Sequence, residues 1–165
     1  MTGHTSREEI LKRVQKRGGE YLESVSGNCA QSPIYALQED FPAVRAIPQH
    51  ALTAMSGIAL RGETCGAVTG ALLTLGILTG SEGAAFLDNL PGSMERATKF
   101  CDAFEKEFGS LVCRHIHKKI FGRTYDLSDP VQQMEFVEIG GIAKCRAPVE
   151  TASRIVAEIL LEEEA

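Results

Sequence analysis

The chain has 165 residues and a formal net charge of −5 at pH 7, with no basic tract. A chain of this length buries enough apolar surface to fold without disulfide bonds, so we expect one domain over residues 1–165. The negative charge argues against a nucleic-acid or anionic-membrane partner.

The N-terminal region predicts an amphipathic helix instead of a targeting signal. Ser6 and Glu9 have the spacing of a capping box, and apolar residues follow at helical spacing. Gly18 and Gly19 predict a break or kink in this helix. Charged residues occupy the positions where a secretory signal would carry its apolar region. We therefore expect a cytoplasmic protein.

A second helix is predicted to begin after Asn28, a good capping residue. Cys29 follows this cap directly, and Pro33 is tolerated because it falls near the first turn. Phe41 and Pro42 end the helix, and a short third helix is expected over residues 48–55.

The longest apolar run, residues 64–80, predicts a central helix that is buried on most sides. Thr64 is the expected N-cap and Gly80 the expected C′ residue, which places Cys65 in the first turn, where the helix dipole favours a thiolate. Several glycines in the first half allow neighbouring backbones to approach closely. The run is shorter than the roughly 20 residues that span a bilayer, so no membrane insertion is expected.

A fifth helix is predicted from Ser93 to Phe108, and Cys101 lies on its apolar face. Burial in the core explains Cys101 adequately, because free cysteine is among the most buried residue types. The next predicted helix is capped by Ser110 and carries Cys113 in its first turn. His117 lies four residues later and faces the same way, whereas His115 faces roughly opposite.

Two more helices complete the pattern. The first begins at Asp129 and Pro130 and ends at Gly140 and Gly141, and the second begins near residue 147, just after Cys145. No strand pattern of convincing length is present. We therefore expect an all-α domain of about six or seven helices around the glycine-rich central helix.

Four of the five cysteines share a property that Cys101 lacks: each falls at or beside a predicted helix start. They are Cys29, Cys65, Cys113 and Cys145. Four converging helix starts would form a thiolate-rich pocket, which needs a positive counterweight such as iron. Pairwise disulfide formation, or four unrelated buried cysteines, are the alternatives.

The motifs around these cysteines resemble those of a redox-active family named for its C, CGAxxG, C, C cysteine pattern (C_GCAxxG_C_C). The segments are NCAQ, TCGAVTGALLTLG, FGSLVCR and KC, and CGAVTG matches the CGAxxG signature in full. The resemblance covers roughly residues 20–160. A similar module of split-Soret cytochromes is associated with an iron–sulfur centre. The chain has no CxxCH, so covalent haem is not expected.

Three functions remain open. The resemblance and the thiol ligands favour an iron–sulfur protein, with a 2Fe-2S cluster held by the four cysteines for electron transfer or redox sensing. A thiol–disulfide exchange protein using Cys65 and Cys29 is an alternative, weakened by the absence of CxxC. A structural zinc on the same four thiolates is another. The pattern contains no hydrolase or transferase constellation, leaves the redox partner unidentified, and is compatible with a homodimer.

Overall fold

The structure is a computed structural model that describes residues 6–163. Seven helices of seven residues or more make up most of this part of the chain. They are α1 (Arg7–Tyr21), α2 (Gln31–Leu37), α4 (Gly66–Thr79), α5 (Phe86–Phe108), α6 (Cys113–Phe121), α7 (Pro130–Glu138) and α9 (Arg146–Glu163). Shorter turns are α3 (Gly57–Leu60), α8 (Gly141–Lys144), a π-helical turn (Leu22–Ser26) and three 3₁₀ helices (Pro42–Ala46, Gln49–Leu52 and Gly83–Ala85). Over residues 6–163 the only strand-like pairing is one isolated bridge. The predicted all-α, single-domain fold is confirmed.

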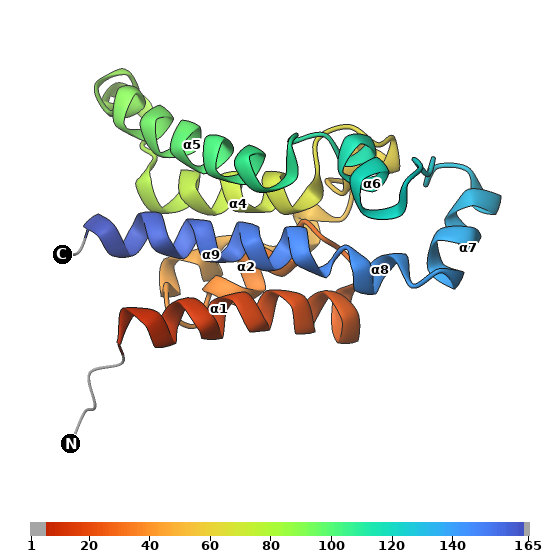
Figure 1. Cartoon of the computed structure of the whole chain (residues 1–165). Helices are drawn as coiled ribbons and strands as arrows, with labels where there is room; N and C mark the ends of the chain where they lie inside the picture. The colour runs from red at the N-terminus through yellow and green to blue at the C-terminus, as the bar shows by residue number, and fades with distance from the viewer. Residues whose placement is uncertain (1–5, 164–165) are drawn as a thin grey trace.

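Helix α9 lies at the centre of the bundle and packs against α1, α2, α4 and α5 (Figure 1). Its apolar face, from Val149 to Leu160, meets the aromatic side chains of Phe100 and Phe104 in the core. The shorter helices α6, α7 and α8 gather at one end of the bundle, away from the start of α1 and the end of α9. None of the described helices is long and apolar enough to cross a membrane.

Helix α1 begins as predicted but does not break at its glycines. The Ser6 hydroxyl accepts a hydrogen bond from the Glu9 amide at 3.2 Å, and the Glu9 carboxylate accepts one from the Ser6 amide at 2.7 Å. A Cβ at Gly18 would lie 2.8 Å from Ser153 Oγ of α9. The glycines therefore allow close packing of two helices, and the predicted kink is wrong.

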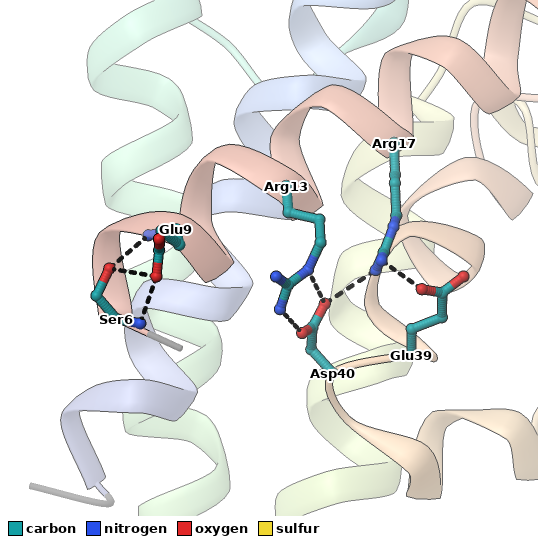
Figure 2. Close-up of polar contacts among 6 residues, drawn as sticks. All are labelled: Ser6, Glu9, Arg13, Arg17, Glu39 and Asp40. Atoms are coloured by element: carbon teal, nitrogen blue, oxygen red, sulfur yellow. Dashed lines mark hydrogen bonds and ion pairs between the residues drawn. The ribbon is translucent and has the colours of Figure 1, made fainter. Parts of the chain in front are cut away.

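An ion-pair cluster ties α1 to the chain that follows α2 (Figure 2). The carboxylate of Asp40 accepts hydrogen bonds from the guanidinium groups of Arg13 and Arg17, and Arg17 also pairs with Glu39. The Asp40 side chain is only 11% exposed, so this cluster is better shielded from solvent than a typical surface pair. It holds α2, and with it the segment that carries Cys29, against α1.

Helix α5 starts earlier than the sequence indicated. It begins at Phe86 and contains Pro91 in its second turn, although Ser93 was the expected cap. The Ser93 hydroxyl instead donates a hydrogen bond of 3.0 Å to the Thr79 carbonyl at the end of α4. Helix α5 packs against α4 and α9 and continues through Pro91, although proline normally ends a helix.

Helix α4 is buried in its first half and exposed along one side of its second half. Leu73 and Ile77 are 41% and 45% exposed, so the expectation of burial on most sides holds only near the N-terminus. A Cβ at Gly70 would lie 2.2 Å from the carbonyl oxygen of Ala30. The N-terminal half of α4 therefore packs directly on the backbone next to Cys29.

Candidate functional site: a four-cysteine cavity

All four predicted site cysteines line a single cavity of about 320 Å³ at the end of the bundle. They come from four separate segments of the chain, and the cavity wall is mainly apolar. Cys65 is 6% and Cys113 9% exposed, while Cys29 and Cys145 are partly buried. Cys101 does not line this cavity and packs against the hydrophobic core, as its sequence position indicated.

Backbone hydrogen bonds between two loops position Cys65 and Cys113. The Cys65 amide donates to the Leu111 carbonyl at 2.8 Å, and the Cys113 amide donates to the Glu63 carbonyl at 2.6 Å. Thr64 and Val112 form the isolated antiparallel bridge between these bonds. Cys65 is itself the N-cap of α4, a role predicted for Thr64, and Cys113 is the first residue of α6.

A left-handed turn at α3 forms the cavity wall next to these two cysteines. Ile58, Ala59 and Leu60 have φ values of 48°, 55° and 65°, and Gly57 has a φ of 55°. This backbone conformation costs about 1–2 kcal/mol for each residue that has a Cβ. A Cβ at Gly57 would stand 3.6 Å from Cys113 Sγ. The strained segment therefore lies directly on the site, a common place for such strain.

Polar contacts hold Cys29 at the N-terminus of α4. Its thiol donates to Ser56 Oγ at 3.3 Å, and the Ser56 hydroxyl donates to Asn28 Oδ1 at 3.0 Å. The same Asn28 oxygen accepts the amides of Ala30 and Gln31, but the N-cap of α2 is Ala30 and not Asn28, the predicted cap. A Cβ at Gly66 would lie 2.3 Å from Cys29 Sγ, so this first glycine of the CGAVTG motif leaves the space that the sulfur occupies.

Cys145 ends α8 and immediately precedes α9. Its sulfur lies 3.8 Å from Nε2 of His117, and the sulfur of Cys113 lies 3.6 Å from the same nitrogen. The predicted orientation of His117 toward Cys113 is confirmed. His115 is exposed, and its Nδ1 lies 3.0 Å from Ser110 Oγ on the other side of α6.

Burial raises the pKa of all four thiols above the ordinary value of 9.0. The pKa of Cys113 rises to about 12 through burial and then through the charges of Cys29 and Cys145. Burial raises that of Cys65 well above its usual range, and the charges of Cys29 and Cys113 add to the effect. Burial also raises the pKa of Cys145, and the charges of Cys29 and Cys65 raise it further. Ionisation of any one thiol thus opposes ionisation of the other three.

The prediction that helix starts would produce thiolates is therefore wrong for the protein without a bound cation. The amides of Ala67 and Val68 at the start of α4 do lower the pKa of Cys65, but burial outweighs them. The partial charge at a helix N-terminus stabilises a thiolate by less free energy than the transfer of that thiolate from water into an apolar cavity costs.

All four cysteines line the cavity. Within residues 6–163, no three side chains of His, Cys, Asp or Glu have an arrangement that could hold a single metal ion. Sequence reasoning missed two contributors to the site, Ser56 beside Cys29 and Phe136 beside His117. A lone serine in a loop and one phenylalanine in a short helix carry no local signal of such contacts.

A family model described as "Putative redox-active protein (C_GCAxxG_C_C)" matches residues 27–159. The chain belongs to this family. The match to the C_GCAxxG_C_C family runs from Gly27 into α9 and therefore includes all four cysteines of the cavity. Neither the search of curated proteins nor that of solved structures found a match to the chain.

Proposed function

We propose that the four-cysteine cavity binds one iron–sulfur cluster, with 2Fe-2S favoured, and that the protein transfers electrons or senses redox state. The ligands would be Cys29, Cys65, Cys113 and Cys145. The observation that carries the proposal is that these four thiols from distant segments line one cavity and electrostatically oppose one another's ionisation. A cluster of this kind accepts and releases single electrons when bound.

The electrostatics of the cavity suit a cationic centre with thiolate ligands. Four neutral thiols are stable there without a cation, but several thiolates are not, because burial and mutual repulsion raise each pKa. Ferric or ferrous iron would supply the missing positive charge. Amide groups at the start of α4 favour the thiolate forms of both Cys29 and Cys65 and would donate to their sulfurs.

The surrounding residues would control access to the centre. The wall of the cavity is largely apolar, with Leu22, Ile116 and Phe136 among its lining residues. Such a wall limits water near the sulfurs and lowers the local dielectric constant, both of which influence a reduction potential. The Ser56 hydroxyl, 3.3 Å from Cys29 Sγ, fixes the orientation of that side chain.

The match to a family described as redox-active favours a cluster over a structural zinc ion, because zinc has no redox chemistry. An iron–sulfur cluster held by four cysteine thiolates does have such chemistry. Thiol–disulfide exchange receives less support, because the raised pKa values leave little thiolate at neutral pH.

Metal and sulfide analysis of protein purified without oxygen tests the proposal. We expect equal amounts of iron and acid-labile sulfide, together with visible absorption that bleaches on reduction. Serine at any of the four cavity cysteines should reduce the iron content strongly, whereas the matched control Cys101→Ser should retain it. Wild-type protein that folds and is reduced but contains no iron or sulfide would refute the proposal. Zinc with loss of the fold on chelation would favour the structural site instead.

A further inference from the structure

His117 is a buried polar side chain with an uneven environment. It is 2% exposed, and its two ring nitrogens differ sharply in their surroundings. Nε2 faces the sulfurs of Cys113 and Cys145, at 3.6 and 3.8 Å. Nδ1 is buried and has no hydrogen-bond partner among residues 6–163. A buried nitrogen without a partner is unusual and calls for a physical explanation.

Three aromatic rings hold the imidazole in this orientation. Phe136 stacks on it with a centroid distance of 5.1 Å and an interplanar angle of 23°, and Phe121 meets it edge-on at 5.3 Å and 87°. The ring of Tyr125 lies edge-on to it, at a centroid distance of 6.3 Å and an interplanar angle of 71°. The enclosure is apolar and gives Nδ1 no hydrogen-bond partner among residues 6–163, so only one ring nitrogen can use an N–H.

The environment indicates which nitrogen carries that proton. Sulfurs that ligate iron have lost their protons and can only accept hydrogen bonds. Nε2 therefore has two acceptors in front of it, while an N–H at Nδ1 would find none. The proton therefore belongs on Nε2.

The same contacts argue against His117 as a metal ligand. A histidine that binds a metal through one nitrogen normally donates the N–H of the other to a carboxylate, a carbonyl oxygen or water. Nδ1 has no such acceptor among the described residues. The ring is thus suited to donate to the sulfurs of the centre from outside its ligand set.

We propose that His117 is a positioning residue of the four-cysteine centre, whose Nε2–H donates to the sulfurs of Cys113 and Cys145 and raises the reduction potential. This inference rests on the proposed iron–sulfur function. Reduction makes the centre one charge more negative, and an N–H directed at a thiolate sulfur stabilises the more negative form. Removal of the donor therefore favours the oxidised form.

Reduction potentials of three cluster-loaded variants test the role of the N–H. His117→Leu removes the donor, His117→Gln supplies an amide N–H near the position of Nε2, and His117→Asn supplies one near Nδ1. We expect Leu and Asn to shift the potential downward and Gln to stay near wild type. His115→Leu, on the exposed side of the same helix, is the matched control and should leave the potential unchanged.

Iron content and pulsed EPR of the reduced protein distinguish the possible outcomes. We expect iron per chain to stay at the wild-type level in all three His117 variants and the nitrogen coupling of a ¹⁵N-histidine sample to be weak. Reduction potentials equal to wild type in the Leu and Asn variants would overturn the inference about His117 but would not contradict the proposed iron–sulfur function. Strong nitrogen coupling, or iron lost from Leu and Gln alike, would make His117 a ligand and also overturn it. Wild-type protein without iron would refute the proposed function, and the inference with it.

Discussion

Two glycines of the same helix should respond in opposite ways to substitution by alanine. A Cβ at Gly70 would stand 2.2 Å from the Ala30 carbonyl oxygen, whereas a Cβ at Gly76 would meet nothing within 4 Å. Relief of the contact at Gly70 requires the backbone of α4 and that of residue 30 to separate by about 1 Å, because Cβ contacts under 3.0 Å essentially do not occur. The obstacle is main chain, so a change of side-chain rotamer cannot remove it.

The balance of two free energies gives the expected size of each effect. Alanine gains about 1 kcal/mol over glycine inside a helix, and overpacking of a core costs about 1–3 kcal/mol. With a backbone obstacle the cost lies near the upper end, so Gly70→Ala should lower the free energy of unfolding by about 2 kcal/mol. Gly76→Ala, at an exposed position, should raise it by up to about 1 kcal/mol.

Urea unfolding of the metal-free, reduced protein, followed by circular dichroism, measures both variants under the same conditions. Linear extrapolation gives the two free energies, and unchanged m-values would show that the unfolded states are comparable. Equal effects of the two alanines, or a Gly70→Ala protein at least as stable as wild type, would refute the argument that α4 packs on the backbone of residue 30.

Two further predictions concern the thiols. Because burial raises the pKa of Cys113 from 9.0 to about 12, the unfolded chain ionises this thiol before the folded protein does, so the stability of iron-free, reduced protein should fall as the pH rises from 9 to 12. The loss of unfolding free energy that this residue causes is roughly 4 kcal/mol at most. Cys113→Ala should therefore flatten a plot of unfolding free energy against pH. An identical slope in the variant and the wild type would contradict the prediction. Separately, Gly66→Ala should displace the Cys29 sulfur, since its Cβ would stand 2.3 Å away, and should reduce iron per chain in protein made without oxygen, whereas Gly76→Ala retains wild-type iron. Full iron retention by Gly66→Ala would count against Cys29 as a ligand.

The sequence by itself determined the features that depend on near neighbours in the chain. Apolar residues at helical spacing predict the all-α class, and the side chain of Ser6 accepts an amide in the first turn of its helix as expected. A separation of four residues places His117 on the same helix face as Cys113. The CGAVTG motif and the cysteine order indicate the family that the match to residues 27–159 confirms. These properties follow from the geometry of one or two helical turns.

Only the tertiary structure decided the features that depend on burial and on distant segments. A glycine pair typical of a helix break instead faces α9, and a serine expected to cap α5 binds the end of α4. The thiol pKa values differ in direction from the expectation, since desolvation depends on which segments cover each sulfur. The contacts of Ser56 with Cys29, and of Phe136 with His117, likewise form only when the chain folds. Local spacing predicts which side chains share a helix face, but long-range packing determines how much water reaches them.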